Sequence, residues 1–435
     1  MKKSKWLALA GVALLSVGAL AACSSKSSTS GTTYGYIYNS DPETLDYITS
    51  NTGPTKTAVT NGVDGLMEAD KYGNLVPSVA EDWSVSQDGL TYTYKIRKGV
   101  KWYTSDGEEY ANVTAKDFVT GLKHAADTNS EAIYLLQNSV KGLNDYLSGA
   151  NKDFSNVGIK AVDDYTLQYT LSQPEPYWNS KLTYSVTWPV NGDFLKSKGK
   201  DFGKSTDPTS ILYNGPYLLK ALTTKSSIEF TKNENYWDKD HVYFDNIKLT
   251  YDDGSDQESL ERNFTDGVYN LARLFPTSSN YSKVEKQYKD NIFYTQPGSA
   301  VEGVGINIDR QTYGHTSKEN DQQKTSTKTA LLNKDFRQSL GFAIDRTNYA
   351  AQLNGKEGGS TAVRNIYVKP DFVQADGKDF GTMVMDQLPA YGDEWSGVNL
   401  ADSQDGLYNP EKAKAEFAKA KEALQAEGVQ FPIHL

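Results

Sequence analysis

Cysteine is almost absent from this sequence, which holds one residue of that type, Cys23, in 435. A lone thiol excludes an intrachain disulfide, and it leaves no cluster of Cys and His residues with the spacing of a metal site. The four histidines, His124, His241, His315 and His434, are scattered and share no surrounding pattern. Each is better explained as an ordinary core or surface residue than as a ligand or a catalyst. We therefore expect no metal and no cofactor.

The motifs of the common hydrolases are missing as well. The chain contains neither a G-x-S-x-G elbow nor an H-E-x-x-H helix. Residues 303–305 begin like a dinucleotide-binding loop but lack its third glycine. The acidic turn at residues 252–256 does not have the spacing of a calcium loop. We predict that the protein is not an enzyme; a hydrolase whose carboxylates lie outside any motif is the third-ranked hypothesis.

Positive charge is also in short supply. The formal net charge is −10, and aromatic residues make up 12% of the chain. Such a composition disfavours binding to nucleic acid, which is recognised mainly through basic patches. The length exceeds what one hydrophobic core usually covers, so at least two domains are expected.

The N-terminus has the build of an export signal. Lys2, Lys3 and Lys5 form a basic head, and residues 6–20 carry no charge. A spanning helix needs about 20 apolar residues, so export is favoured over a membrane pass. Leu20-Ala-Ala-Cys23 has the form of a bacterial lipobox, which makes Cys23 the expected lipidation site; a plain cleavage site with an accidental cysteine is the alternative. The Ser/Thr/Gly tract at residues 24–33 is typical of a flexible tether.

Local patterns predict a mixed α/β chain. Residues 34–38 alternate as a strand does, and hairpins are indicated with turns at residues 88–89 and 163–164. Thr114 and Asp117 form a capping-box pattern at a helix start. Helices are also predicted near residues 57–67 and over residues 333–345, the latter with Phe336, Leu340, Ala343 and Ile344 on its buried side. Short strands are expected within residues 214–251. The polar stretch 311–333 is predicted to be a surface loop.

The C-terminal pattern is a helix followed by a strand. Asn409, Pro410 and Gly428 are the cap, first residue and stop of a helix whose expected buried stripe is Ala413, Phe417, Ala420 and Leu424. The last seven residues, "VQFPIHL", alternate apolar and polar as a strand does. From the pattern alone, this segment is either a terminal strand within a sheet or a strand that stops midway.

Several motifs in a fixed order resemble the extracytoplasmic solute-binding proteins of the oligopeptide, dipeptide and nickel family (family 5). They are "GNLVP", "WSVSQDG", "GVKW" and "TAKDF" in the first third, then "YNGPYLL", "FTKNENYW" and "FRQSLGFAIDR". The stretches "SEAIYLLQNSVKGL" and "ERNFTDGVYNLARLFP" are similar to the Ami/Ali oligopeptide-binding lipoproteins of Gram-positive bacteria. The resemblance extends over residues 31–435.

This resemblance implies a two-lobed, type II periplasmic-binding-protein-like α/β fold with mixed sheets. It assigns residues 1–22 to a signal peptide, 23–33 to a tether, 34–62 and 182–296 to lobe I, 63–181 to a subdomain of that lobe, and 297–435 to a partial distal lobe. The family's G-W-x-x-D segment, which meets the peptide's amino group, does not occur here. The resemblance thus implies a C-terminally truncated chain with an incomplete distal lobe.

The function implied by the resemblance is the capture of oligopeptides for an ABC permease, by a monomeric lipoprotein anchored on the outer face of the cell membrane. Truncation is expected to impair it, and a non-transport surface protein, such as an adhesin or decoy, is the alternative. A peptide strand would be gripped mainly through its backbone. The candidate ligand-binding residues are Ser40, Asp41, Glu43, Tyr134, Glu302 and Asn307.

Overall fold

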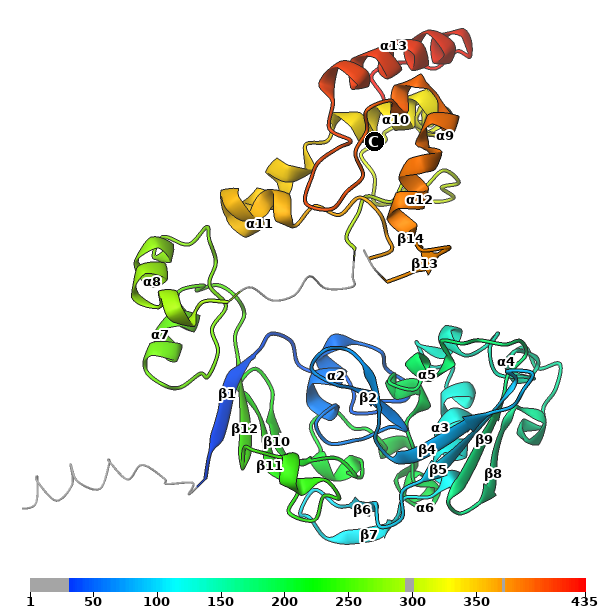
Figure 1. Ribbon diagram of the computed structural model, residues 1–435, viewed down its shortest axis with the longest axis vertical. Helices are drawn as coiled ribbons and strands as arrows, with labels where there is room; N and C mark the ends of the chain where they lie inside the picture. The colour runs from blue at the N-terminus through cyan, green and yellow to red at the C-terminus, as the bar shows by residue number, and fades with distance from the viewer. Residues whose placement is uncertain (1–30, 294–300, 370–371) are drawn as a thin grey trace, which may run out of the picture. The chain divides into compact units, whose positions relative to one another are not determined.

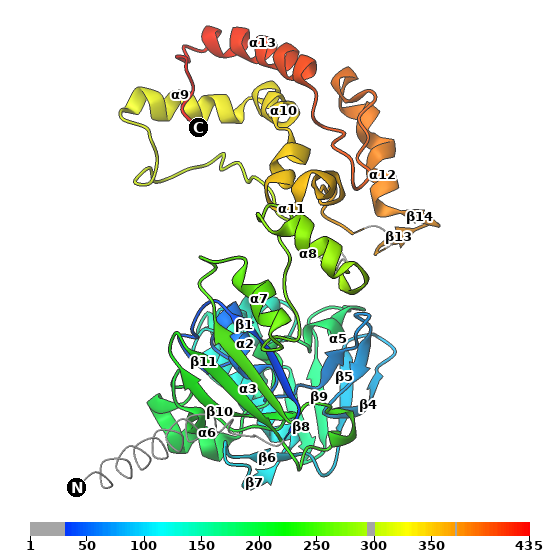
Figure 2. The same cartoon turned by 90° about the vertical axis from the view of Figure 1, so that its left-hand side faces the viewer.

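The computed structural model describes residues 31–293, 301–369 and 372–435. The chain divides into two compact units (Figures 1 and 2). Unit 1 comprises the described residues up to Asp256 together with Arg262–Ala272, and unit 2 comprises Gln257–Glu261 and the described residues from Arg273 to Leu435. The predicted assignment of residues to lobes stays a prediction. Cys23 and its tether up to residue 30 lie outside the described residues.

The first sheet of unit 1 brings the start of the chain beside a segment more than 200 residues later. Its strand order is β1-β12-β11-β10. The strand β1 pairs in parallel with β12, Thr33 opposite Asn246, and the other pairs are antiparallel. Both views show blue β1 beside the green strands of this sheet. The sheet is mixed, as predicted. Its strands are β1 (Thr33–Tyr38), β10 (Tyr217–Thr223), β11 (Ser227–Lys232) and β12 (Asn246–Tyr251).

The second sheet of unit 1 is built from the two predicted hairpins, which are confirmed. Its order is β4-β5-β9-β8, and every pair is antiparallel. Tyr92, Tyr94 and Ile96 of β5 are buried, whereas Lys95 between them is exposed, as the alternation predicts. The strands of this sheet are β4 (Ala80–Val85), β5 (Thr91–Ile96), β8 (Ile159–Asp163) and β9 (Thr166–Thr170). Unit 1 also has two smaller hairpins, which pair β2 (Met67–Ala69) with β3 (Leu75–Pro77) and β6 (Lys101–Tyr103) with β7 (Glu109–Asn112).

The longest helix of unit 1 begins at the predicted capping box. The backbone N–H of Thr114 donates to Asp117 Oδ2 at 2.8 Å, and the Thr114 side chain accepts from the backbone of Asp117. Trp102 Nε1 also donates to Asp117 Oδ2, at 3.1 Å. The helices that lie wholly in unit 1 are α2 (Gly53–Val59), α3 (Ala115–Asp127), α4 (Leu143–Leu147), α5 (Trp178–Lys181) and α6 (Gly192–Lys198). The first residues of α7 (Ser259–Thr265) belong to unit 2 and the rest to unit 1.

The helix predicted near residues 57–67 is partly wrong. The helix α2 ends at Val59, and Met67 already belongs to strand β2. Pro54 starts the helix early, because its fixed backbone angle suits the first helical turn. Beyond Val59, the backbone N–H groups of Gly62 and Val63 close a turn on the Val59 carbonyl.

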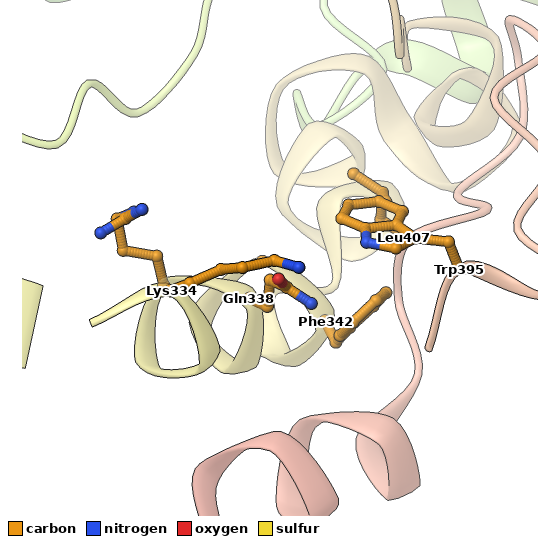
Figure 3. A pocket seen from close by; sticks show the side chains of 7 residues that line it. Lys334, Gln338, Phe342, Trp395 and Leu407 are labelled. Atoms are coloured by element: carbon orange, nitrogen blue, oxygen red, sulfur yellow. The ribbon is translucent and has the colours of Figure 1, made fainter. Parts of the chain in front are cut away.

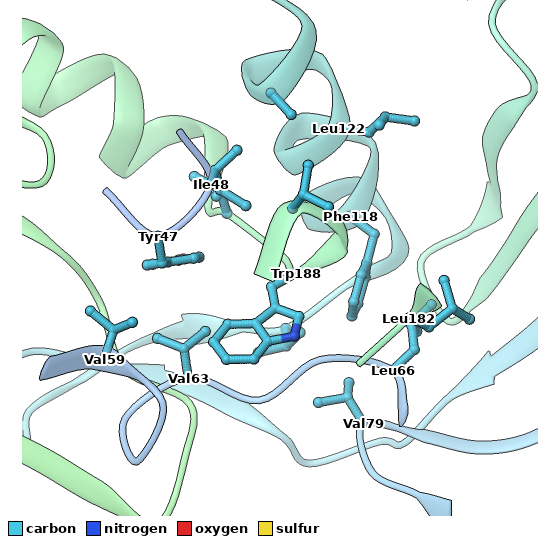
Figure 4. Packing of buried hydrophobic residues seen from close by; sticks show 14 of the residues in the cluster. Tyr47, Ile48, Val59, Val63, Leu66, Val79, Phe118, Leu122, Leu182 and Trp188 are labelled. Atoms are coloured by element: carbon cyan, nitrogen blue, oxygen red, sulfur yellow. The ribbon is translucent and has the colours of Figure 1, made fainter. Parts of the chain in front are cut away.

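The core of unit 1 packs around Trp188 (Figure 4). Tyr47 lies 6.0 Å from Trp188 between ring centroids, and Phe118 of α3 belongs to the same cluster. Two glycines make room for Trp188, one beside its indole and one beside its backbone. A Cβ on Gly65 would lie 2.5 Å from Trp188 Cδ1, and one on Gly121 would lie 2.2 Å from the Trp188 carbonyl oxygen. Side chains at these positions would push the helix and the loop away from the core.

Unit 2 is mainly helical, and α10 packs closely against α13. Its small core contains Ala330, Phe336, Ala420, Leu424 and Val429. The helices are α8 (Tyr281–Gln287), α9 (Asp321–Leu332), α10 (Lys334–Ala343), α11 (Arg346–Thr361), α12 (Phe380–Gln387) and α13 (Pro410–Ala426), and β13 (Gln374–Ala375) pairs with β14 (Lys378–Asp379).

The predicted loop at residues 311–333 is wrong, because α9 occupies its second half. Asn320 caps the helix by accepting from Gln323 N at 2.9 Å, and Gln323 Oε1 accepts from Glu319 N at 2.6 Å. The Asn320 side chain thus caps the helix, and the Gln323 side chain satisfies the backbone N–H of the residue before the cap. Ser326 and Thr327 are buried against the rest of unit 2, so packing holds a polar sequence in a helix.

The buried faces of α10 and α13 match the predicted stripes only in part. In α13, Ala413, Ala420 and Leu424 are buried as predicted. In α10, Phe336 and Phe342 are buried, whereas Ala343 is exposed and Ile344 is exposed beyond the helix end. The caps of α13 are confirmed, but Phe417 is 38% exposed and Glu416 is 2% exposed. The helix α13 turns this carboxylate toward its buried side, where Lys419 Nζ pairs with it at 2.7 Å.

The predicted C-terminal strand is not formed in the structure. Its backbone groups find partners on helices: Val429 N donates to Leu424 O at 2.9 Å, and Gln430 N donates to Ser326 Oγ at 3.1 Å. Thr327 Oγ1 in turn donates to His434 O at 2.9 Å. Val429 joins the core of unit 2, so the apolar pattern reflects packing on α9 and α13.

Candidate functional site

The loop that follows β1 was predicted to contact ligand through Ser40, Asp41 and Glu43. Ser40 and Glu43 are exposed. Asp41 is occupied with structural contacts. It accepts from Tyr38 OH at 2.9 Å and from the backbone N–H of Lys225 at 3.1 and 3.0 Å. Lys225 lies in the β10–β11 turn with φ of 50°, so Asp41 fixes that turn against β1.

The same contact changes the chemistry of Tyr38. Burial, together with the hydrogen bond to Asp41, raises the pKa of Tyr38 from 10.0 to about 12. The phenol therefore stays protonated and continues to donate to the carboxylate. Of the three predicted residues in this loop, Ser40 and Glu43 have the exposure that suits contact with a ligand.

Three exposed tyrosines of unit 1 lie on segments that are bonded to α2 or α5 or adjoin these helices. Tyr134, Tyr177 and Tyr184 are 60%, 58% and 44% exposed, and we call these three residues the tyrosine face. Tyr134 was predicted from the sequence, whereas Tyr177 and Tyr184 were not. Tyrosine side chains give rigid contact area with a polar tip, a combination common at binding surfaces.

Specific polar contacts join the segments that carry these tyrosines. Lys56 Nζ of α2 lies 6.0 Å from the ring centroid of Tyr184. Asn51 N, just before α2, donates to Glu131 Oε2 at 2.8 Å, three residues before Tyr134. Ser139, in the loop after Tyr134, accepts from Lys181 Nζ of α5 at 2.6 Å. The tyrosine face is therefore carried by loops that are fastened to one another.

An ion pair with little exposure stabilises α5 beneath the tyrosine face. Lys181 Nζ lies 2.8 Å from Glu175 Oε2, with side-chain exposures of 17% and 4%. Lys181 Nζ is also 5.3 Å from the ring centroid of Tyr177. Tyr92 OH donates to the Glu175 carbonyl at 2.9 Å, and burial raises the pKa of that phenol. Because a buried carboxylate needs a partner, this pair fixes the loop that presents Tyr177.

The remaining predicted residues belong to unit 2. Glu302 and Asn307 are both exposed, and Asn307 Oδ1 accepts from Asp309 N at 3.1 Å. The sequence analysis missed Tyr177, Tyr184, Lys56 and Lys181. The available signal was the aromatic residues of "PYWNSKLTY", but the buried Trp178 and the exposed Tyr177 are adjacent and cannot be told apart by composition.

Nothing in the described residues suggests metal chemistry or a membrane pass. Within residues 31–293, 301–369 and 372–435, no three His, Cys, Asp or Glu side chains are grouped so as to hold a metal ion. In the same part of the chain, no helix has the length and apolar character needed to cross a bilayer.

The fold is that of periplasmic binding proteins of type II, mixed α/β with several sheets. A structure of the pheromone receptor PrgZ matches 91% of this chain and 69% of its own, with a TM-score of 0.68 and 23% identity. Listeria monocytogenes OppA bound to peptide matches 93% of this chain and 70% of its own, with a TM-score of 0.67 and 25% identity.

The chain belongs to the bacterial extracellular solute-binding proteins, family 5, whose model matches residues 74–433. It is 68% identical to the oligopeptide-binding protein AmiA of Streptococcus pneumoniae and 62% identical to the oligopeptide-binding protein SarA of Streptococcus gordonii. Each alignment covers the whole of this chain, and 66% and 67% of the respective relative. The chain thus spans about two thirds of the length of these curated relatives.

Proposed function

We propose that this protein captures oligopeptides outside the cell and delivers them to an ABC importer. The observation that carries the proposal is the 68% identity to an oligopeptide-binding protein along the entire chain. The fold of the family and the absence of hydrolase motifs from the sequence agree with binding without catalysis.

The tyrosine face supports peptide capture in physical terms. A peptide with variable side chains is best held through its backbone amides and by broad, tolerant contact surfaces. Tyrosine rings supply such surfaces, and their hydroxyl groups can donate to carbonyls directly or through water. Ser40 and Glu43 add exposed polar groups on the loop after β1, and Glu302 and Asn307 are proposed to contribute from unit 2.

We further propose that Cys23 is the lipidated first residue of a monomeric protein anchored on the outer face of the membrane. The support is the lipobox at residues 20–23 and the extracellular nature of the family. Replacing Cys23 by serine should abolish incorporation of labelled palmitate and release the protein into the medium of growing cells. Retention of the variant in washed membranes with undiminished label would contradict the proposal.

Peptide capture is tested by a thermal melt of the full chain with and without a mixed oligopeptide library. A ligand that binds only the folded state stabilises it by about 2.7 kcal/mol at a hundred times its Kd. We expect the melting temperature to rise with peptide, and the rise to shrink in the double variant Tyr134→Ala/Tyr184→Ala. The control is Tyr243→Ala, which removes a tyrosine that is 77% exposed and lies outside the tyrosine face.

The same experiment separates the second candidate, a non-transport surface protein that retains the fold. A cooperative melt that does not move with any peptide in the library would support it and refute peptide capture. An equal shift in the tyrosine double variant and the wild type would refute the role of the tyrosine face alone.

A further inference from the structure

Two hollows of unit 2 differ in the character of their walls. One, of about 220 Å³, lies beside α10 and has mostly apolar walls that include Lys334, Gln338, Phe342 and Trp395 (Figure 3). The charge of its lysine is already balanced, since Lys334 Nζ lies 3.4 Å from Glu394 Oε1. The other hollow, of about 310 Å³, lies between the first half of α9 and the segment that follows α13. We call it the α9 pocket.

The walls of the α9 pocket are polar but carry little charge. Four of the residues that line it have side-chain amides, namely Asn320, Gln322, Gln323 and Gln430. Among the described residues around it, none is Asp, Glu, Lys or Arg, and His434 is the one with a titratable side chain. Because a buried charge needs a charged partner, such walls suit an uncharged polar ligand better than an ion.

Hydrogen bonds determine which end of each α9 amide is free. Asn320 Oδ1 accepts from Gln323 N at 2.9 Å, and Gln323 Oε1 accepts from Glu319 N at 2.6 Å. Since backbone N–H groups occupy these oxygens, the free ends are Asn320 Nδ2 and Gln323 Nε2, and both are donors. Gln322 is turned the other way. Its Nε2 donates to Ser326 Oγ at 3.0 Å, which leaves Gln322 Oε1 as an acceptor.

These free amide ends are open to a molecule that enters the pocket. Asn320, Gln322 and Gln430 are exposed. Gln323 is half-buried, and it has no side-chain atom that is both buried and unpartnered. The α9 pocket therefore offers two donors and one acceptor of fixed orientation, together with the amide of Gln430.

Phe431 adds an aromatic wall to these amides. Its ring is half-buried, and Phe417 of α13 contacts it edge-on, with 6.0 Å between the ring centroids. A sugar ring carries hydroxyl groups around its edge and C–H groups on its faces. Each hydroxyl can both donate and accept, and the C–H face can lie on an aromatic ring. Amides of both polarities beside an aromatic ring match this chemistry.

The two walls of the α9 pocket are joined to one another. Gln430 N donates to Ser326 Oγ at 3.1 Å, and Thr327 Oγ1 donates to His434 O at 2.9 Å. Ser326 and Thr327 are buried, so the helix side of both contacts is held by packing. A pocket whose walls are already ordered loses less entropy on binding than a mobile one.

From these contacts we propose that the α9 pocket binds one ring of a neutral pyranose sugar. Asn320 Nδ2 and Gln323 Nε2 donate to hydroxyl oxygens, Gln322 Oε1 accepts from a hydroxyl, and a C–H face of the sugar lies on Phe431. The volume is at the lower end of the range of small-molecule sites, which suits a single ring. The site lies entirely within unit 2. It goes beyond peptide capture by the tyrosine face, and its failure would leave that proposal untouched.

The probes are the methyl glycosides of glucose, galactose, mannose and N-acetylglucosamine. Each is titrated into the full-length protein, and the readout is the set of side-chain ¹H–¹⁵N resonances of Gln322 and Gln430, assigned with Gln322→Met and Gln430→Met. We expect a saturable shift in the millimolar range with at least one sugar. The methyl glycoside of glucuronic acid has the same ring with a carboxylate, and should bind no more tightly than the glucoside.

Matched glutamine variants test the location of the site. Gln322→Met and Gln430→Met each remove one hydrogen-bonding group of the pocket, and each should weaken binding about fivefold. Gln425→Met makes the same substitution at an exposed position of α13 outside the pocket, and should leave the affinity unchanged. An unchanged indole resonance of Trp395 establishes that unit 2 of each variant is folded.

Three results would overturn the proposal. One is the lack of a saturable shift with any of the four sugars. Another is an equal affinity in the wild type, Gln322→Met and Gln430→Met, which would place binding elsewhere. The third is tighter binding of the glucuronide than of every neutral sugar, which would make the α9 pocket an anion site.

Discussion

Asp64 should make the stability of unit 1 fall as the pH rises, and Asp64→Asn should remove that fall. Asp64 is 9% exposed, and Tyr236 OH donates to its Oδ2 at 2.8 Å. Asn214 holds its backbone on both sides, accepting from Asp64 N at 2.8 Å and donating to Asp64 O at 3.2 Å. Burial raises the pKa of Asp64 from 3.8 to about 7, although the Tyr236 hydrogen bond lowers it in part.

The direction and size of the effect follow from proton linkage. In the unfolded chain the carboxyl loses its proton near its ordinary pKa, whereas in the folded protein it keeps the proton up to about pH 7. The associated stability is fully present below the unfolded pKa and is lost as the pH rises through the folded pKa. A shift of this size corresponds to about 4 kcal/mol of unfolding free energy.

The assay is urea unfolding from about pH 4 to about pH 8 at constant ionic strength, followed by tryptophan fluorescence. Five of the seven tryptophans lie in the described part of unit 1. Asparagine keeps the shape and can still accept from Tyr236 OH, so the variant should be more stable than the wild type at the alkaline end. Asp82→Asn is the control, since it removes an exposed carboxylate from the same unit. Parallel pH profiles for Asp64→Asn and the wild type would refute the reasoning.

Three further predictions concern stability and are read out by the same urea titration. Lys181→Met leaves the Glu175 carboxylate buried and unpaired, and should cost about 3–5 kcal/mol of unfolding free energy; a loss below about 1 kcal/mol, typical of an exposed pair, would contradict the support assigned to α5. Thr114→Ala removes the α3 cap and should cost about 1 kcal/mol, so an unchanged midpoint would argue against the capping box. Leu424→Ala in the core of unit 2 should cost about 2–5 kcal/mol of unfolding free energy, detected by the fluorescence of Trp395. Phe417→Ala should cost clearly less, because Phe417 is partly exposed. Equal losses would show that Phe417 contributes to the core as the sequence predicted.

The elements that the sequence predicted correctly depend on neighbours in the chain. The hairpins at residues 80–96 and 159–170 combine a turn signal with alternating apolar residues, and both interactions are local. The caps of α3 and α13 are likewise made within a few residues of each helix start. Family membership was also predicted from the sequence, because it depends on short motifs that occur in a fixed order along the chain.

The errors arose where packing between distant segments overrides local preference. The polar residues of α9 form a helix because Ser326 and Thr327 are buried and bonded to the C-terminal segment. That segment alternates as a strand does, but its backbone groups find partners on α9 and α13.

The sequence by itself determined the two hairpins, the caps of α3 and α13, the acidic character and the family of this protein, because these depend on residue type, order and short-range hydrogen bonds. Tertiary structure alone decided which tyrosines are exposed on unit 1, that Asp64 is buried beside Tyr236, and that Gln338 and Trp395 face one pocket. Each of these features joins residues far apart in the chain or adjacent residues that face opposite ways. Only the folded packing determines the exposure, pKa and partners of such side chains.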